Sequence, residues 1–353
     1  MRVLHVISEM GAGGAEAVVA GMVRSGGDFG WESGVASGGG HRAEALRAQR
    51  VPTYDLPVAR RRATGVLRAV AAARRAIRGF RPDVVLAHNV SASLVSRLAA
   101  GRTPVVSVFH GVAETDVRGA ARILRRTSRA VVAVADASAS LLRARGVAVE
   151  VIPNAVFAEP PRVHRGAIRG LLGLGPDVPV ALCPARLEPQ KRHDVLLEAW
   201  TLVAGAVLLL AGDGSLRAEL ELLAEELGVA DRVRFLGTRC DVPDLLEATD
   251  VTVLTSDWEG MPIAVLESLA AGRPVVASDV DGVREVLSGG GGVLVPRRDP
   301  KAAAAALAKF LFDSNARAAA AEAGRAAVER DHDPHTQMKK YDELLRTTVG
   351  GRR

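Results

Sequence analysis

The sequence predicts an α/β protein with two doubly wound, Rossmann-like domains, each built on a parallel sheet with helices on both faces. Two observations support this prediction. Short apolar runs alternate with helical segments along the chain, and each run is continuously hydrophobic, as in strands buried on both faces. The alternation pauses once, at residues 150–166, where three prolines and mixed charges indicate an interdomain linker.

The first half of the chain is expected to contain strands separated by helical crossovers. Residues 2–8 form a short apolar run that ends in glycines, and a helical pattern begins at the glycines. Similar strand-and-loop units follow, with helical stretches such as 65–79 between them. These units are 83–89, 104–111 and 130–136.

The alternation of apolar runs and helical segments resumes after the linker and predicts a second parallel sheet. Its expected strands are 179–186, 206–214, 232–238, 250–256 and 274–279. Helices are expected at 193–204, 215–228, 242–249, 262–271, 301–309 and 316–328, with a last helix at about 335–350. Two such domains facing each other would leave a cleft at the carboxyl ends of their strands, where open α/β sheets bind ligands.

Composition argues against several classes of protein. No apolar run reaches the roughly 20 residues that cross a bilayer, and the N-terminus lacks the pattern of a signal peptide. Cys183 and Cys240 have no metal-type spacing and make no disulfide framework, so a cytoplasmic location is expected. Aromatic residues are only 3% of the chain, which disfavours a surface that stacks nucleic-acid bases.

Positive charge is concentrated in the first part of the chain. Residues 1–150 hold 22 arginines against 11 acidic residues, whereas the whole chain has a net charge of +6. Such a basic half suits an anionic membrane surface or an acidic acceptor, and residues 58–81 are its most basic stretch. A solvated basic surface without a partner is the alternative.

A glycine turn follows the first predicted strand. Gly11, Gly13 and Gly14 would let the backbone approach a ligand, and the helix that starts there favours an anion. Glu16 stands where a dinucleotide fingerprint needs its third glycine, which argues against a dehydrogenase. Glu16 is instead expected to complement the helix dipole, and a tight turn without a ligand is the alternative.

Two cations and two histidines occupy predicted strand ends. Arg186 ends a strand and Lys191 lies in the following loop, and two cations at the mouth of a helix suit a diphosphate. His88 and His110 end successive strands and therefore share one sheet edge. No third ligand has the spacing of a metal site. Surface charges and structural histidines are the alternatives.

The stretch SDWEGMPIAVLESLAAGRPVVASD, residues 256–279, contains two glutamates eight positions apart. Pro262 suits the first position of a helix, which places Glu259 in a loop and Glu267 within the helix. About 12 Å along a helix is too far for two carboxylates that share one reacting atom, which lie ~5–5.5 Å apart in retaining hydrolases. The pair is therefore expected to contact two ends of one elongated ligand.

The anion of that ligand is expected to face the free backbone amides at the start of the helix, those of Gly260, Met261 and Ile263. The nearby Asp279-Val280-Asp281 has the spacing of a metal-binding pair. We interpret these two aspartates as turn residues, because they follow a predicted strand.

Taken in order, these motifs resemble the retaining glycosyltransferases of family 4, which have the GT-B fold. EGMPIAVLE (259–267) is similar to the E-x7-E element of that family, and ARLEPQK contains its R-x4-K pair. GAGGAE, FHG and IPNAV are similar to its glycine loop, its histidine and its interdomain segment. The resemblance covers nearly the whole chain. Ala155, Ala185 and Arg192 depart from it, because the family has glycine at these positions.

The resemblance implies an acceptor-binding domain of residues 1–157 with the helix 335–353, and a donor-binding domain of residues 158–334. It implies four catalytic residues: His110 beside the reacting carbon, Glu259 on the transferred sugar, and Arg186 with Lys191 on the diphosphate. The other implied donor contacts are Gly13, Gly14, Gly260, Met261, Pro262, Ile263 and, on the ribose, Glu267. His88 and Glu16 are candidates on the acceptor side.

The implied reaction transfers a hexosyl unit, glucosyl or N-acetylglucosaminyl in type, from a UDP-sugar to an acceptor hydroxyl with retention of configuration. No metal or other cofactor is expected, since cations and helix termini would stabilise the leaving diphosphate. The acceptor is either a small natural-product intermediate or a lipid-linked glycan at the inner membrane surface. A nucleotide-sugar epimerase and a non-catalytic nucleotide-sugar-binding protein are the alternatives.

Overall fold

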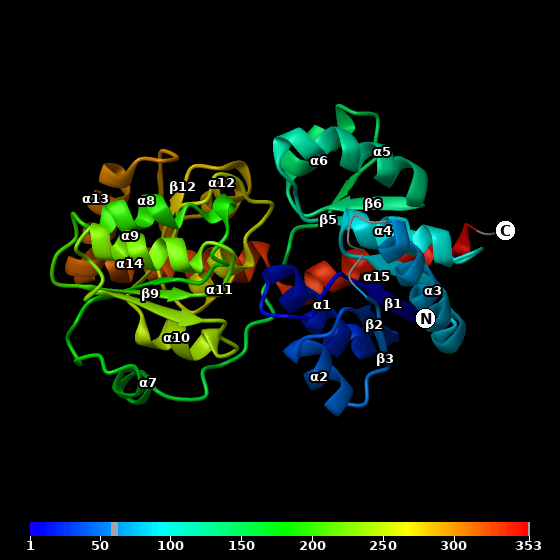
Figure 1. Cartoon of the computed structure of the whole chain (residues 1–353). Coiled ribbons are helices and arrows are strands. Elements are labelled where there is room, and N and C mark those ends of the chain that lie inside the picture. The colour runs from blue at the N-terminus through cyan, green and yellow to red at the C-terminus, as the bar shows by residue number, and fades with distance from the viewer. Residues whose placement is uncertain (58–62, 352–353) are drawn as a thin grey trace. The chain divides into compact units, whose positions relative to one another are not determined.

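The computed structural model describes residues 1–57 and 63–351. The chain forms two compact units, Met1–Phe157 with Pro334–Arg353, and Ala158–Asp333, which we call the N-terminal unit and the C-terminal unit (Figure 1). Each unit has its own parallel sheet with helices on both faces, which confirms the predicted fold class.

The sheet of the N-terminal unit has seven strands within the described residues, and all of its neighbouring strands pair in parallel. The strands are β1 (Arg2–Val6), β2 (Glu32–Ser37), β3 (Thr53–Asp55), β4 (Val84–Ala87), β5 (Val105–Phe109), β6 (Ala130–Ala133) and β7 (Glu150–Val151). Their order is β3-β2-β1-β4-β5-β6-β7. The strand order reverses between β1 and β4, so the loops after these two strands flank the position where such sheets bind ligands.

The helices of this unit cover both faces of the sheet. They are α1 (Gly14–Ser25), η1 (Gly26–Phe29), α2 (His41–Ala48), α3 (Ala63–Phe80), α4 (Val90–Ala99), η2 (Glu114–Asp116), α5 (Val117–Thr127), α6 (Asp136–Arg143) and α15 (Pro334–Gly350). The last helix, α15, returns to this unit from the end of the chain (Figure 1). Its Asp342 accepts a hydrogen bond from the indole of Trp31 at 2.8 Å, and its Gln337 donates one to the carbonyl of Pro153 at 2.9 Å.

The C-terminal unit repeats the same winding with six strands in its sheet, all of them in the described part of the chain. The strands are β8 (Val180–Cys183), β9 (Val207–Ala211), β10 (Val233–Gly237), β11 (Val251–Leu254), β12 (Val275–Ser278) and β13 (Gly292–Val295). Their order is β10-β9-β8-β11-β12-β13, so the reversal lies between β8 and β11.

The helices of the C-terminal unit are α7 (Arg165–Leu171), η3 (Pro189–Lys191), α8 (His193–Trp200), α9 (Arg217–Glu226), α10 (Val242–Ala248), α11 (Ile263–Ala270), α12 (Asp281–Leu287), α13 (Pro300–Phe312) and α14 (Ser314–Asp331). Strand β9 shows why the sheet needs helices on both faces. Leu208 and Leu210 belong to one apolar cluster with Trp200, whereas Leu209 belongs to another with Leu245. Both faces of this strand are therefore buried.

The structure also contains elements that the sequence pattern did not predict, namely the strands β2, β3, β7 and β13 and the helices α2, α7 and α12. β2 is rich in small residues, β13 has only four residues, and β3 and β7 have only three and two, so none of these strands has a long apolar run. The predicted linker 150–166 is wrong at its start, because Glu150 and Val151 pair with β6. Neighbouring strands provide the pairing that these segments do not encode locally.

Candidate active site

Two loops at the reversal point of the C-terminal sheet carry the predicted donor-binding residues. The loop after β8 contains Arg186 and Lys191 and leads into α8, and the loop after β11 contains Glu259 and leads into α11. Because β8 and β11 pair directly, their carboxyl ends bring the two loops together.

Lys191 and Glu259 form an ion pair between these two loops. Lys191 Nζ lies 2.5 Å from Glu259 Oε1, and the Ser256 hydroxyl donates to the same carboxylate oxygen at 2.6 Å. The two charged side chains expose only 15% and 8% of their surface. Since water is largely excluded, removing either partner would leave a charge that is costly to bury.

Further hydrogen bonds hold the two loops at a fixed spacing. The Thr255 hydroxyl donates to the carbonyls of Lys191 and Arg192, at 3.1 and 2.9 Å. The amide of Asp257 donates to the Gln190 carbonyl at 2.9 Å, and the Gln190 side chain donates to the Trp258 carbonyl at 2.7 Å. The ion pair is thus set in a backbone that is fixed by its own contacts.

Arg186 lies at the surface in the same loop as Lys191. Its side chain is exposed, and it forms no ion pair with a carboxylate in residues 1–57 or 63–351. The backbone around it is tightly packed, because a Cβ added to Gly212 would lie 2.0 Å from the Ala185 carbonyl oxygen and one added to Gly214 would lie 2.4 Å from that of Leu187. Glycine is therefore required at both positions in the loop after β9.

The segment Gly260–Ile263 is buried and leads into α11. Pro262 is the N-cap residue with an extended backbone, φ −72° and ψ 114°, so its predicted place as the first helical residue is wrong by one position. The helix starts at Ile263 because the extended Pro262 precedes the first turn. Glu267 lies one turn further along α11 and is partly exposed. Met261 is buried.

Gly282 was missed by the sequence analysis. A Cβ at this position would lie 1.6 Å from the Gly260 carbonyl oxygen, so only glycine allows the start of α12 to approach the Glu259 loop. The sequence signal that could have identified Gly282 is its position directly after Asp281. Asp279 and Asp281 both bind Arg284, at 2.8 and 2.9 Å. The interpretation of both as turn residues is wrong for Asp281, which is the first residue of α12. Among the described residues, no group of histidine, cysteine or acidic side chains is arranged to hold a metal ion.

A buried cysteine and histidine lie behind the Lys191 loop. Cys183 Sγ is 3.6 Å from His193 Nε2. Burial raises the pKa of the Cys183 thiol to about 12, and burial, assisted by the charge of Lys191, lowers the pKa of His193 to about 4. Both side chains are therefore neutral near pH 7, and the thiol is not a nucleophile.

The glycine turn of the N-terminal unit forms the start of α1. Gly13 is the N-cap of the helix, and the Glu16 carboxylate folds back over it, since a Cβ on Gly13 would lie 2.1 Å from Glu16 Oε2. An acidic side chain thus lies at the positive end of the helix dipole, as predicted from the sequence. Gly40, which has a φ of 119°, packs against the Met10 carbonyl on the other side of the turn and was also missed.

Three histidines form a row across neighbouring strands of the same unit. His5 lies in β1, His88 follows β4 and His110 follows β5, and the ring centroids are 5.3 Å apart for His5 and His88 and 6.1 Å apart for His88 and His110. His5 Nδ1 and His88 Nε2 are 3.1 Å apart. The predicted neighbours His88 and His110 are thus stacked, and His5 was missed because it lies inside an apolar strand.

Burial keeps this row of histidines uncharged. It lowers the pKa of His5 to about 3 and that of His110 to about 4. Burial, followed by repulsion from His5 and His110, holds the pKa of His88 well below its usual value. His88 exposes only 1% of its surface, so it supports His110 from within the unit rather than reaching solvent.

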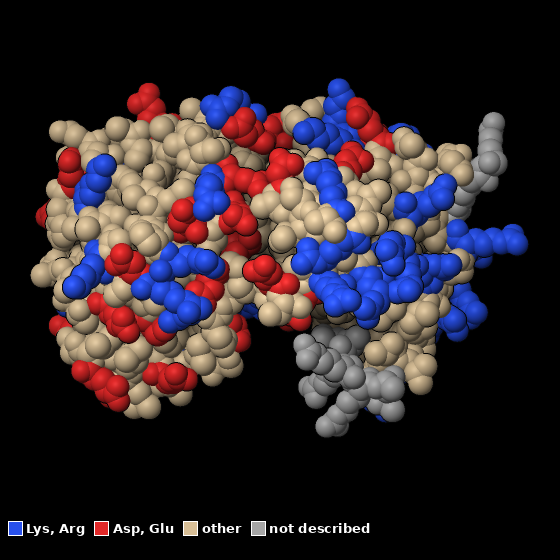
Figure 2. Space-filling view, turned by 90° about the horizontal axis from the view of Figure 1, so that it is seen from above, with Lys and Arg blue, Asp and Glu red and all other residues tan. Residues whose placement is uncertain are grey.

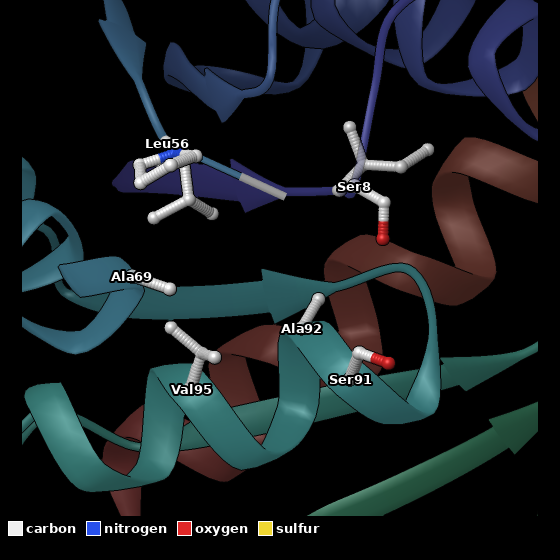
Figure 3. A pocket seen from close by; sticks show the side chains of 8 residues that line it. Ser8, Leu56, Ala69, Ser91, Ala92 and Val95 are labelled. Carbon is white, nitrogen blue, oxygen red and sulfur yellow. The ribbon is translucent and has the colours of Figure 1, made fainter. Parts of the chain in front are cut away.

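A small cavity lies at the same end of the N-terminal sheet. Figure 3 shows Ser8 and Ser91 at one end of it and Ala69 and Val95 at the other. Its volume of about 10 Å³ is the room that one water molecule needs. This cavity is therefore too small for a sugar.

Comparison with known proteins agrees with the fold of two Rossmann-like units. The fold is that of a solved structure of HepE from Anabaena in complex with UDP-glucose, with a TM-score of 0.86 and 24% identity over 98% of this chain and 100% of that chain. Residues 165–327 match the family model "Glycosyl transferases group 1", and residues 12–159 match "Glycosyltransferase Family 4". Two Rossmann-like units of this kind define the GT-B class of protein.

Two curated relatives support the assignment of the chain to a family. The chain is 33% identical over 336 residues to a D-inositol 3-phosphate glycosyltransferase of Mycobacterium marinum, a match that covers 85% of this chain and 71% of that protein. It is 36% identical over 178 residues to the lipopolysaccharide core biosynthesis glycosyltransferase LpsE of Rhizobium meliloti, which covers 50% of this chain and 52% of that protein. The chain belongs to the family 4 glycosyltransferases. The match to LpsE spans about half the length of that relative.

Proposed function

We propose that the protein transfers a hexosyl unit, glucosyl or N-acetylglucosaminyl in type, from a UDP-sugar to an acceptor hydroxyl with retention of configuration. The observation that carries this proposal is the Lys191–Glu259 pair, which lies at the reversal point of the C-terminal sheet, next to the start of α11. UDP-glucose as the ligand of HepE supports a UDP-linked donor.

In the proposed reaction the bond between the sugar carbon C1 and the diphosphate oxygen breaks, and a bond from C1 to the acceptor oxygen forms on the same face. The acceptor proton moves to the leaving phosphate oxygen. Arg186, Lys191 and the amides at the start of α11 stabilise the negative charge that grows on the diphosphate, which is usually the largest catalytic contribution.

Glu259 and Glu267 are assigned to the two ends of the donor. Glu259 accepts hydrogen bonds from hydroxyls of the transferred sugar, with the backbone of Gly260–Ile263 beside the diphosphate, and Glu267 binds the ribose. In the free protein Lys191 neutralises Glu259, so donor binding gives each of them a new partner: the diphosphate for Lys191 and the sugar hydroxyls for Glu259.

His110, Gly13 and Gly14 are assigned to the same donor from the N-terminal unit. A neutral His110 forms a hydrogen bond with a sugar hydroxyl or carbonyl without adding a positive charge beside the oxocarbenium-like C1, which agrees with its lowered pKa of about 4. Gly13 and Gly14 allow backbone contact with the phosphates at the start of α1 once the Glu16 carboxylate, which lies over Gly13 in the free protein, moves away. No metal ion has a step in this scheme, and unchanged turnover in the presence of a chelator is the expected result.

The acceptor is proposed to be presented at an anionic lipid surface. The adjacent helices α3, α4 and α5 contain no acidic residue, and we call their exposed arginines the basic face: Arg68, Arg74, Arg75, Arg78, Arg97, Arg118, Arg122, Arg125 and Arg126. Figure 2 shows Lys and Arg side chains gathered over the N-terminal unit, on the right of the view. Part of the stretch predicted as basic, residues 58–62, lies outside the described residues.

Two features of the basic face favour lipid over a soluble acceptor. Leu67 and Leu98 lie on α3 and α4 and expose 71% and 49% of their surface, and interfacial helices combine such apolar side chains with cations. A surface hollow of about 400 Å³ beside α4 and α5 is lined by four arginines, which suits phosphate groups: Arg97, Arg102, Arg126 and Arg129. No described helix is long and apolar enough to cross a bilayer.

A thermal-shift panel of nucleotides and nucleotide sugars tests the proposed donor. Ligand binding stabilises the folded state by mass action, so UDP and one UDP-hexose are expected to raise the midpoint of unfolding more than the other nucleotides. Incubation of that donor without acceptor separates the alternatives. A new sugar isomer would identify an epimerase, and tight binding without turnover on any acceptor would identify a binding protein.

A further inference from the structure

Two residues of the C-terminal unit have a backbone conformation that side chains other than glycine rarely adopt. Arg192 has a φ of 50° and Arg298 a φ of 59°, both in the left-handed region. Arg192 directly follows Lys191, at a position where the family has glycine. Such a conformation persists only where surrounding contacts hold it, and it is concentrated at functional sites.

Both arginines contact the same carboxylate. Arg298 donates to the two oxygens of Asp257 from Nε and Nη2, at 2.9 and 2.8 Å, and Arg192 Nη1 lies 3.5 Å from Asp257 Oδ2. Arg192 is itself held by Asp194, with Nη2 2.6 Å from Oδ2. Arg297 donates to the backbone carbonyl of Asp257 at 3.3 Å. A single carboxylate therefore joins three segments of the chain.

Asp257 and its partner Arg192 are close in the sequence to the two residues of the ion pair. Asp257 precedes Glu259 by two residues, and its partner Arg192 follows Lys191 by one. Its backbone amide also donates to Gln190, in the Lys191 loop. The contacts of Asp257 therefore join the same two loops as the Lys191–Glu259 ion pair.

Hydrogen bonds of Thr255 and Gln190 also join these loops. The two charged contacts between the loops, the Lys191–Glu259 pair and the contacts of Asp257, differ in what donor binding does to them. The proposed donor takes Lys191 and Glu259 as ligands, so it opens the ion pair between them. The Arg192–Asp257–Arg298 contacts use none of the groups assigned to the donor. They remain in place when the ion pair opens, and they keep the two loops from separating.

We propose that Asp257 is a positioning residue that, through Arg192 and Arg298, sets the spacing between Lys191 and Glu259 for donor binding. This inference rests on the proposed function of these two residues. The hydrogen bond from Arg298, followed by the charges of both arginines, holds the pKa of Asp257 below its usual range, which agrees with a carboxylate that stays ionised. A loop spacing set before the donor binds lowers the entropic cost of binding.

The test compares Asp257→Asn with Arg298→Gly, Arg192→Gly and the double variant Asp257→Asn/Arg298→Gly. Glycine accepts the left-handed backbone, so these substitutions remove the guanidinium group without adding strain. We expect the donor KM and the dissociation constant of UDP to rise at least about fivefold, with kcat changed less than about twofold. The double variant should be no worse than Asp257→Asn, because both substitutions remove the same contact.

Asp331→Asn is the matched control, since it removes an exposed ion pair with Arg330 at the end of α14, outside the two loops. Hydrogen exchange provides a second readout. In Asp257→Asn the amides of residues 186–192 and 255–262 should exchange faster together, whereas the rest of the unit keeps the wild-type rates.

Equal losses of kcat in all variants with unchanged KM and unchanged UDP affinity would overturn the positioning role. Failure of the proposed function has a different signature. A wild-type protein that binds UDP but transfers no sugar contradicts transfer, while the UDP affinities of the variants still decide the role of Asp257. A wild-type protein that binds no nucleoside diphosphate contradicts both.

Discussion

At the scale of single residues, the Lys191–Glu259 pair has the strongest effect on both stability and the proposed chemistry. The pair is mostly buried, and each partner neutralises the other. Breaking a buried pair costs on the order of 3–5 kcal/mol because a charge is left unpaired. Loss of function and loss of stability must therefore be measured separately for these residues.

Lys191→Ala and Glu259→Ala are expected to lower transfer by more than about 100-fold, because each removes a group that acts on the transition state. Steady-state kinetics with a UDP-sugar, read alongside the unfolding midpoint, would check this. Lys301→Ala removes an exposed lysine on α13 and serves as the control. Near-normal turnover in folded Lys191→Ala protein would contradict the assignment.

The row of histidines predicts a dependence of stability on pH. The pKa of His5 is lowered from 6.5 to about 3 and that of His110 to about 4. Below pH 6.5 the unfolded chain binds protons that the folded unit does not, so this contribution is complete above pH 6.5 and is lost as the pH falls. At pH 5 each histidine with such a lowered pKa decreases the free energy of unfolding by about 2 kcal/mol.

Urea unfolding at pH 7.5 and pH 5 would check this dependence. His88→Leu removes one titrating ring, and we expect that variant to lose less stability than the wild type between the two pH values. His335→Leu replaces a histidine of α15 outside the row and is the comparison variant. Equal losses of stability for His88→Leu and the wild type would show that burial does not lower the pKa of this row of histidines.

At the scale of elements, close backbone contacts decide whether the two donor loops keep their positions. Gly282 at the start of α12 packs against the Gly260 carbonyl, and Gly212 after β9 packs against that of Ala185. No side chain fits at either contact. A helix start and a strand end therefore fix the loops from opposite sides.

Gly282→Ala is expected to push α12 away from Gly260 and to weaken UDP binding about tenfold, since the added Cβ would lie 1.6 Å from a backbone oxygen. Calorimetric titration with UDP measures the change. Gly170→Ala in α7 is the matched control, because its Cβ meets no atom within 4 Å, and it should keep the wild-type affinity. Unchanged UDP binding by Gly282→Ala would mean that this contact does not position the donor loop.

At the scale of the whole molecule, charge is divided between the two units. The first 150 residues carry a net charge of +11, and the arginines of α3, α4 and α5 stand without acidic residues on those helices. Long-range attraction to an anionic surface follows from such a distribution and is screened by salt. The charge pattern is thus a property of the N-terminal unit rather than of the donor-binding loops.

We expect the protein to sediment with vesicles that contain phosphatidylglycerol and not with pure phosphatidylcholine, and to be released by high salt. Arg122→Gln, Arg125→Gln and Arg126→Gln combined should weaken binding about 100-fold, at ~1 kcal/mol for each arginine. The same charge change at Arg24, Arg47 and Arg50, which lie outside the basic face, should have a smaller effect. Equal losses in the two triple variants would argue against a specific face.

Much of the fold could be predicted because strands buried on both faces have a continuous apolar pattern. β1, β4, β5, β6 and β8 to β12 all lie within predicted segments. β2, β3, β7 and β13 could not be predicted, since short or glycine-containing strands depend on pairing with neighbours rather than on their own pattern. Their positions at or near sheet edges are decided by that pairing.

The sequence alone was enough to predict the α/β class and to select Arg186, Lys191, Glu259 and Glu267, because periodicity and motif spacing are local properties of a chain. Only the tertiary structure pairs Lys191 with Glu259, joins Arg192 and Arg298 through Asp257, and places His5 beside His88. These contacts link residues that are tens of positions apart. They form only when parallel strands bring their carboxyl ends to one sheet edge, which no local pattern records.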